Sequence, residues 1–407
     1  MIKDPTVTTS QLDLVALGKS HLYPNYRQPP LVLTRGEGSR VWDAAGKQYF
    51  DLFAGIAVST LGHGHPRLAG AIAEQAKQLL HVSNYFYNQP NVELAAKLCR
   101  LTAMDRVFFC NSGTEAIEAS LKLARRHFFA KGERDRLRII AFENSFHGRT
   151  LGALAATGQP KYKDGFGPLP GVTHVPYGDV ARVRQEMGPD VAGILVEAVQ
   201  GEGGVLPAPP GFLAALRDIV DEAGALLIAD EVQTGVGRTG TFLGFEHDGV
   251  KADVVALAKG LGGGVPIGAM LCRAPLSEAL PPGSHGSTFG GNPLASAAAL
   301  AVLEVLEQEG LLAQVRERGA ELAQRLTELQ AKHARLVAAT RGRGLLQALV
   351  LKDDVDARAL LGKLQDAGVL VTVAGGQALR VSPPLNITSS ELGAALDIVD
   401  RVFGAWP

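Results

Sequence analysis

This chain of 407 residues contains few cysteines, and its positive and negative charges almost balance. The three cysteines, Cys99, Cys110 and Cys272, are scattered and odd in number, which argues against a disulfide framework and against zinc spacing. The formal net charge of -1 gives no electrostatic reason to expect nucleic acid or an anionic membrane as a partner. We therefore expect a protein of the reducing cytoplasm.

Long hydrophobic runs are also missing. No uncharged apolar run reaches the ~18 residues that a membrane span needs. The segment from Met1 to Pro5 has neither the apolar core of a signal peptide nor the arginine bias of a transit peptide. With 46% hydrophobic and 20% charged residues, the composition is that of a globular protein. Its length predicts about two domains.

Glycine, in contrast, is abundant, and its 48 residues fall mainly in short loops between apolar runs. Those runs have strand length and alternate with helical patterns, which predicts an α/β fold with a mostly parallel sheet covered by helices on both faces. We predict strands at 106–110, 137–142, 193–197 and 225–230 and in the run that ends at Lys259, with helices over 114–124 and 211–222. Ligands of such sheets bind beyond the carboxyl ends of the strands.

The two ends of the chain differ from this centre. The sequence pattern of residues 31–52 predicts a small antiparallel meander. After about residue 295 the pattern predicts one long helix, heptad-like from Val302 to Leu311, then a strand at 346–351, a short helix and a strand at 378–381. We predict a large domain over 55–300 and a smaller α+β domain that combines 1–54 with 301–407.

Lys259 is the most informative single residue, because it closes a strand-like apolar run and precedes a glycine-rich stretch. Desolvation disfavours the charged form of a buried lysine, so its amine can act as a nucleophile near neutral pH and form an imine with an aldehyde. A strand-terminal lysine that simply reaches solvent is the plain alternative.

Three further features stand at comparable positions. The Asn111, Ser112, Gly113, Thr114 turn precedes a helix, whose N-terminal N–H groups suit a phosphate, although Ser112 as an ordinary N-cap is the alternative. Asp230 ends a buried strand and needs a partner, either a pyridinium N–H or a loop that it caps. Phe146 would stack on a flat ring or pack in the core. An aldehyde, a ring nitrogen, a ring face and a phosphate together predict pyridoxal phosphate as cofactor.

Two other patterns predict different chemistry and are not convincing. The glycines at 235, 237 and 240 match G-x-G-x-x-G, but no helical period follows them, so we do not expect a dinucleotide site. His63 and His65 lack further ligands at suitable spacing, so we expect a turn and no metal.

These residues resemble the motifs of class III (ornithine-type) aminotransferases, which are fold-type I pyridoxal-phosphate enzymes, over nearly the whole chain. The acetylornithine-type members of arginine biosynthesis are the most similar. The matching segments are 111–116, 146–150, 200–204, 230–235, 258–260 and 286–293. One departure is Ala198, where the family usually has proline after the glutamate that is Glu197 here. We expect an altered backbone at that point without loss of chemistry.

The resemblance implies a role for each cofactor contact. Lys259 would hold the aldehyde, Asp230 would pair with the ring nitrogen, and Gln233 would contact the 3′-oxygen. The remaining implied contacts are with the two ring faces, Phe146 and Val232, and with the phosphate, Ser112, Gly113 and Thr114. Thr288 would complete the phosphate site from the other subunit, which implies a homodimer with shared active sites.

Substrate contacts are implied in the same way. Arg149 offers a fork for the carboxylate of the amino donor, and Arg380 would bind a carboxylate of glutamate or 2-oxoglutarate. Glu202 would neutralise Arg380 in one half-reaction and swing away in the other, while a plain structural ion pair is the alternative. Ser287 and Tyr26 are further candidates for contacts with the substrate.

The implied reaction is a ping-pong transfer of the δ-amine of N-acetylornithine to 2-oxoglutarate, giving N-acetylglutamate semialdehyde and glutamate. Another ω-amine transaminase is the alternative, acting on ornithine, succinylornithine, 4-aminobutyrate or a lysine-pathway substrate. A mutase on an amino aldehyde would need no 2-oxoglutarate, and Arg380 argues against it. A non-catalytic binding homologue would be expected to lack Lys259 or Asp230, and both are present.

Overall fold

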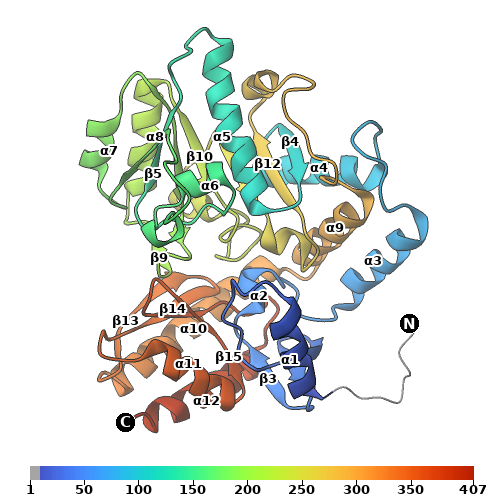
Figure 1. Cartoon of the computed structure of the whole chain (residues 1–407), viewed down its shortest axis with the longest axis vertical. Coiled ribbons are helices and arrows are strands. Elements are labelled where there is room, and N and C mark those ends of the chain that lie inside the picture. The colour runs from blue at the N-terminus through green and yellow to red at the C-terminus, as the bar shows by residue number, and fades with distance from the viewer. Residues whose placement is uncertain (1–9) are drawn as a thin grey trace.

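The computed structural model describes residues 10–407, so the sequence interpretation of Met1 to Pro5 lies outside the described residues. Its centre is a seven-stranded sheet in the order β4-β12-β11-β10-β7-β5-β6 (Figure 1). β12 runs antiparallel to both neighbours, and the other adjacent pairs are parallel, which confirms the mostly parallel sheet. The strands are β4 Arg106–Cys110, β5 Arg138–Phe142, β6 Val172–Val175, β7 Val191–Glu197, β10 Leu226–Asp230, β11 Val254–Leu257 and β12 Gly268–Cys272.

Helices cover both faces of this sheet because successive strand side chains point to opposite sides. On β10, Leu226 and Ile228 pack in the core under α5, whereas Leu227 and Ala229 pack in the core that includes α8 and α9. The helices of this part are α3 Pro66–Gln78, α4 Gln89–Thr102, α5 Gly113–Ala130, α6 Leu151–Ala156, α7 Val180–Glu186, α8 Phe212–Ala223 and α9 Pro293–Gln308, with short 3₁₀ turns η1 Pro160–Tyr162, η2 Gly244–Asp248, η3 Lys259–Gly262 and η4 Ala274–Ala279.

Smaller sheets lie at the other end of the molecule (Figure 1). One joins β1 Leu33–Glu37, β2 Arg40–Asp43 and β3 Gln48–Asp51 to β15 Val369–Leu370; another joins β13 Val337–Arg343, β14 Leu346–Leu351, β17 Ala378–Val381 and β16 Thr372–Ala374; and β8 Val199–Gln200 pairs with β9 Leu206–Pro207. The helices are α1 Gln11–His21, α2 Ala54–Ala57, α10 Leu311–Lys332, α11 Ala357–Asp366 and α12 Ser389–Gly404. β1 to β3 form the predicted meander. Pairing of Val369 with Phe50 joins the two ends of the chain and supports a small domain built from both, whose boundaries at 54 and 300 stay a prediction.

The single long helix predicted after residue 295 is wrong. α9 ends at Gln308 and α10 begins at Leu311. Between them Gly310 has φ +63°, a left-handed conformation that glycine adopts without steric cost and that ends a helix. The apolar pattern continues across this break because both helices bury one side against the same core. Over residues 10–407, no helix combines the length and the apolarity required to cross a bilayer.

The loop after β10 carries several predicted site residues and is held by Glu231. Its buried carboxylate accepts the N–H groups of Gly244 and Phe245 at 2.8 and 2.9 Å and the hydroxyl of Thr234 at 2.5 Å. Burial raises the pKa of Glu231 to about 7, although these hydrogen bonds oppose the shift. The turn that follows Asp230 is thus tied to a group that titrates near neutral pH.

Stability should therefore depend on pH through Glu231. When the pKa of an acid is higher in the folded protein than in the unfolded chain, the acid contributes fully to stability at pH values below the pKa of the unfolded chain. That contribution to the free energy of unfolding is lost as the pH rises through the pKa of the folded protein. Between pH 4.5 and 7 the free energy of unfolding should fall by up to about 3 kcal/mol on account of this group. Glu231→Gln should give a flatter profile, measured as melting temperature against pH. Glu278→Gln, at an exposed position, is the control, and equal slopes for Glu231→Gln and the unmodified protein would refute the assignment.

Candidate active site

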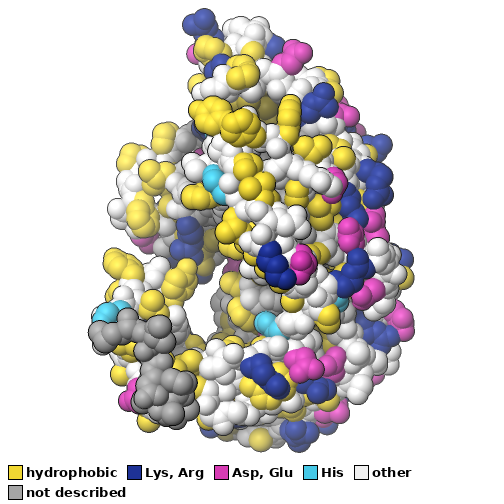
Figure 2. All heavy atoms as spheres, turned by 90° about the vertical axis from the view of Figure 1, so that its right-hand side faces the viewer, with side chains coloured by type: hydrophobic (Ala, Val, Ile, Leu, Met, Phe, Trp, Pro, Cys, Tyr) yellow, Lys and Arg dark blue, Asp and Glu magenta, His cyan; other side chains and the backbone are white. Residues whose placement is uncertain are grey.

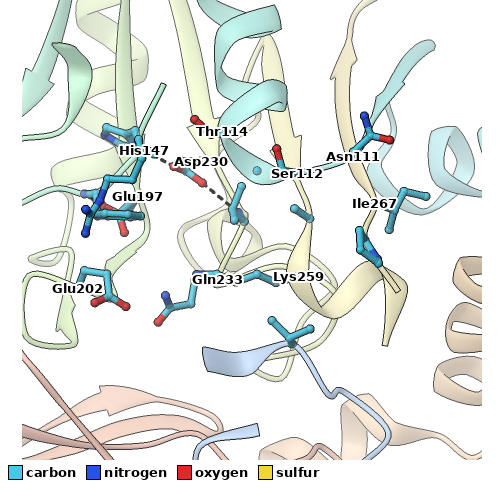
Figure 3. A pocket seen from close by; sticks show the side chains of 18 of the residues that line it. Asn111, Ser112, Thr114, His147, Glu197, Glu202, Asp230, Gln233, Lys259 and Ile267 are labelled. Carbon is cyan, nitrogen blue, oxygen red and sulfur yellow. Dashed lines mark hydrogen bonds and ion pairs between the residues drawn. The ribbon is translucent and has the colours of Figure 1, made fainter. Parts of the chain in front are cut away.

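A cavity of about 400 Å³ opens at the carboxyl ends of the central strands. It brings together most of the predicted site residues, which come from the ends of β4, β10 and β11 and from the loops after β5 and β8: Ser112, Gly113, Thr114, Phe146, Arg149, Glu202, Asp230, Val232, Gln233 and Lys259. Figure 3 shows Ser112 and Thr114 at the end of α5, above Gln233 and Lys259, with Glu202 to one side. The polar residues predicted at the carboxyl ends of the strands therefore meet in one cavity.

The N-terminus of α5 forms one end of the cavity. Ser112 is the N-cap and its hydroxyl accepts the N–H of Glu115 at 3.3 Å, while the Glu115 carboxylate accepts the N–H of Asn111 at 2.8 Å. Gly113 lies against Val232, since a Cβ at position 113 would stand 2.7 Å from Val232 Cγ1. The first N–H groups of a helix lack intrahelical acceptors and suit an anion. The cap and the anion site are thus compatible readings of the same turn.

Asp230 is buried and makes a close pair that the sequence analysis did not anticipate. Its Oδ1 accepts the N–H of Val232 at 3.0 Å, and its Oδ2 lies 2.7 Å from Nδ1 of His147 (Figure 3). His147 is fully enclosed, and its Nε2 has no hydrogen-bond partner within residues 10–407. The position follows Phe146 in a matched motif, which was its only signal in the sequence. The pair fixes one carboxylate oxygen and orients Asp230 toward the cavity.

Glu197 adds a second buried carboxylate at the end of β7. It accepts the N–H of Phe146 at 3.0 Å and that of Gly201 at 3.2 Å. Burial raises the pKa of Glu197 to about 7, with His147 opposing the shift and Asp230 adding to it. Its backbone contacts hold the loop that presents Phe146.

Lys259 follows β11, and its amine faces the cavity. Burial lowers the pKa of Lys259 below that of an ordinary lysine, although Glu202, Asp230 and Glu197 oppose the shift. Its backbone has φ +43°, a left-handed conformation that is strained for a lysine. Thr60 helps to hold it, because its hydroxyl donates to the carbonyl of Gly260 at 2.9 Å. The structure thus provides a lysine whose amine is easily deprotonated and whose position is fixed.

Arg380 lies directly behind the cavity wall and is 2% exposed. Its Nη1 donates to Glu202 at 2.5 Å and to Gln233 Oε1 at 3.1 Å, and its Nε donates to Thr372 at 3.2 Å. Burial alone would raise the pKa of Glu202, but Arg380 and Lys259 outweigh it and the pKa is lowered. The contact foreseen between Arg380 and Glu202 is therefore present in this conformation.

Arg149 and Phe146 also line the cavity. The Arg149 guanidinium carbon lies 4.0 Å from the ring centre of Tyr162 and 5.4 Å from that of Phe146. The two rings pack edge to face, with centres 5.8 Å apart. This stacking holds an exposed cation beside the cavity.

Four predicted residues do not line this cavity, and Arg380, behind its wall, is the first of them. Tyr26 is exposed, and Ser287 and Thr288 line a different cavity beside Ser83, Asn84 and Tyr85. Ser287 is nevertheless linked to the anion end, since Asn111 Nδ2 donates to its hydroxyl at 3.3 Å. Residues that line the cavity and were not assigned a role include Val58, Asn111 and Ile267.

The two rejected patterns have structural explanations. The glycines at 235, 237 and 240 lie in turns that lead to η2 and open no α-helix. Arg238 within that segment is buried and donates to the carbonyls of Leu345 and Pro383, so the segment joins the central sheet to the small sheets. His63 Nε2 lies 2.7 Å from Asp51, and the described residues hold no cluster of three or more metal-ligating side chains.

Known proteins are similar to this chain in sequence and in fold. The family model "Aminotransferase class-III" matches residues 22–403. An acetylornithine aminotransferase from Myxococcus xanthus is 51% identical over 381 residues, which are 93% of this chain and 94% of that protein.

Among solved structures, acetylornithine aminotransferase from Elizabethkingia anophelis is 34% identical with a TM-score of 0.88, covering 98% of this chain and 100% of that one. Ornithine aminotransferase from Toxoplasma gondii, in a structure described as having partial occupancy of PLP at its active site, is 35% identical with a TM-score of 0.93, covering 98% of this chain and 95% of that one. With a lysine, an acid and a helix N-terminus around one cavity, and with these similarities over nearly its full length, the chain belongs to the class-III aminotransferases.

Proposed function

We propose that this enzyme transfers the δ-amino group of N-acetylornithine to 2-oxoglutarate, with pyridoxal phosphate as cofactor, and forms N-acetylglutamate semialdehyde and glutamate. The observation that carries the proposal is the amine of Lys259, with its lowered pKa, in one cavity with Asp230 and the N-terminus of α5. The similarity to acetylornithine aminotransferases supports this choice of donor and a place in arginine biosynthesis.

The donor set of the cavity fits pyridoxal phosphate. The buried carboxylate of Asp230 suits a pyridinium N–H, the N-terminus of α5 suits the phosphate, and the amine of Lys259 suits the aldehyde. Phe146 and Val232 would cover the ring faces, and Gln233 would reach the 3′-oxygen. When bound, the cofactor supplies an electrophilic aldehyde and a ring that withdraws electrons from the reacting carbon.

The chain's own groups then handle protons and charge. Lys259 can accept and return a proton at its Nζ because burial disfavours its ammonium form. His147 keeps Asp230 oriented, and the carboxylate of Asp230 stabilises a positive charge opposite it. The walls of the cavity limit water, which strengthens each of these interactions.

Substrate recognition follows from the two arginines. Arg149, held over Tyr162, would bind the carboxylate of N-acetylornithine, and the pairing of Arg380 with Glu202 would keep Arg380 from attracting the wrong end of this donor. 2-Oxoglutarate carries a second carboxylate, for which Arg380 would exchange Glu202. Another ω-amine transaminase is the second candidate, supported by the similarity to ornithine aminotransferase.

Replacing Lys259 should abolish turnover and leave the fold intact. Lys259→Ala removes the amine that attacks the aldehyde and moves the proton, so kcat should fall by about 10³-fold or more. Borohydride reduction of the loaded enzyme should attach the cofactor at position 259 only in the unmodified protein, as read by peptide mass. Lys251→Ala, on the surface, is the control. Substantial turnover of Lys259→Ala without added amines would contradict the role.

The amino donor can be identified by comparing kcat/KM for N-acetylornithine, ornithine, succinylornithine and 4-aminobutyrate. Ornithine should be poorer than N-acetylornithine by about tenfold or more, because its second ammonium group would lie near the cation of Arg149. An equal or higher kcat/KM for ornithine would assign the chain to the alternative donor.

We also infer a homodimer with shared active sites. A face around the segment 79–87 exposes large apolar side chains, among them Tyr85, Tyr87 and Phe289 at 92%, 96% and 59% exposure. Figure 2 shows hydrophobic side chains gathered on this side of the molecule, which carries α3 and α4 (Figure 1). Monomers rarely expose such patches, so a second copy is the expected cover. Thr288 lies in the same region and would reach the partner's cavity.

A cytoplasmic location is in keeping with three free cysteines.

Mixing two inactive variants tests the sharing. Thr288→Arg should disable the neighbouring subunit's phosphate site, whereas Lys259→Ala disables its own. After mixed refolding, about a quarter of all sites should be intact, because half of the dimers are hybrids with one complete site each. Each variant alone is the control. If Thr288 served its own subunit, every hybrid would lack a complete site and no activity would return.

A further inference from the structure

Arg341 on β13 is half-buried. Within residues 10–407 its side chain forms no hydrogen bond or ion pair, and its Nε is completely buried. Burial lowers the pKa of Arg341, with no carboxylate to oppose the shift. Arg343, two residues further on the same strand, pairs with Asp248 at 3.2 Å. A half-buried guanidinium whose Nε is buried without a hydrogen bond is unfavourable, so its place in the sheet needs an explanation.

The sheet register places Arg341 on the same face as Arg380. Arg341 pairs with Ala348 on β14, and Ala348 pairs with Arg380 on β17. Directly opposite residues point to the same side of a sheet, which puts the Cβ atoms of the two arginines about 10 Å apart. The Arg380 side chain donates a hydrogen bond to the side chain of Thr372, the residue opposite it on β16. The shared face is therefore the one on which both of these side chains lie. Ala348, which carries only a methyl group, is the β14 residue between the two arginines in this register.

The loop that carries Glu202 lies over this face. Val199 and Val205, which flank the loop, pack on Leu346, Ala348 and Ala378 of the same face. In Figure 1, β9 lies next to β13 and β14.

At Gly204 the loop meets the arginine directly, because a Cβ there would stand 2.8 Å from Nη2 of Arg341. Two residues span at most about 7 Å, so Glu202 begins within side-chain reach of Arg341 as well as of Arg380. The backbone of Glu202 is anchored, since its carbonyl accepts the N–H of Gly375 at 3.1 Å. A turn of the Glu202 side chain about this anchored backbone would carry its carboxylate from the side of Arg380 toward Arg341.

We infer that Arg341 is the second partner of Glu202: when a dicarboxylate binds Arg380, the Glu202 carboxylate turns to Arg341. The inference rests on the proposed use of 2-oxoglutarate. Without that substrate, one carboxylate serves two arginines and Arg341 stays unpaired. With it, two carboxylates serve two arginines, so the displaced Glu202 never becomes an isolated buried charge. Arg341 is in this sense a positioning residue for Glu202.

Half-reaction kinetics test the inference. Arg341→Met should raise the apparent Kd for 2-oxoglutarate about tenfold in single-turnover measurements with the aminated enzyme, since Glu202 then competes for Arg380. The Kd for N-acetylornithine in the other half-reaction should change far less. Arg341→Lys should restore part of the loss, and Arg343→Met is the matched control for loss of an arginine from β13. Equal losses in both half-reactions would indicate a structural role and overturn the inference.

Two further measurements separate this inference from the proposed function. In a Glu202→Gln background, Arg341→Met should add no further loss for 2-oxoglutarate, because a neutral amide needs no cationic partner. A crystal structure with glutarate should show the Glu202 carboxylate hydrogen-bonded to Arg341, whichever amine is the true donor. Additive losses, or Glu202 turned elsewhere in that structure, would refute the role of Arg341. Absence of turnover with N-acetylornithine would refute only the proposed donor.

Discussion

The burial of one amine, that of Lys259, constrains the rest of the site. Burial of Lys259 lowers its pKa below that of an ordinary lysine, which favours the uncharged, nucleophilic form of its amine. The same surroundings make every neighbouring charge expensive unless it is paired. Asp230 is accordingly paired with His147, and Glu202 with Arg380. The catalytic character of the cavity and its network of pairs thus have one physical origin.

Backbone strain accompanies this arrangement. Lys259 is left-handed, and so are all four residues of α2, from Ala54 to Ala57, where each such residue costs about 1–2 kcal/mol unless it is glycine. α2 packs against η3, which begins at Lys259, and the next residue, Val58, lines the cavity. Strain of this kind persists only where the surrounding packing determines the backbone. Here it holds the reacting group against the carboxyl edge of the sheet.

The site must also bind substrates of different charge, and charge pairs that can exchange partners would allow this. A transaminase of this type must bind two substrates with different numbers of carboxylates in one cavity. Arg380 is paired with Glu202 in the conformation observed, and Arg341, on the same face of the same sheet, has no hydrogen-bond partner for its Nε among residues 10–407. A fixed scaffold with one mobile carboxylate can then present either a neutral or a cationic pocket without moving its backbone. Specificity of this kind depends on balanced pair energies and not on reshaping of the cavity.

Local sequence patterns were sufficient to predict the central sheet and the chemistry at its edge. Strands buried on both faces must be almost wholly apolar, so β7, β10 and β11 could be recognised locally, together with the polar residues that follow them. β12 was not recognised, because Gly268–Cys272 is short and rich in small residues. The break at Gly310 was missed because the heptad-like pattern runs through it.

Which charged groups pair with one another depends on the folded chain. The pair of His147 with Asp230 spans 83 positions, and that of Arg380 with Glu202 spans 178. The second of these was suggested by family resemblance and not by any local pattern. The place of Arg341 beside Arg380 depends on the register of two strand pairs. Contacts over such separations follow from strand order and register, which short-range periodicity does not encode, whereas the residue types needed at each strand end are a local property of the chain.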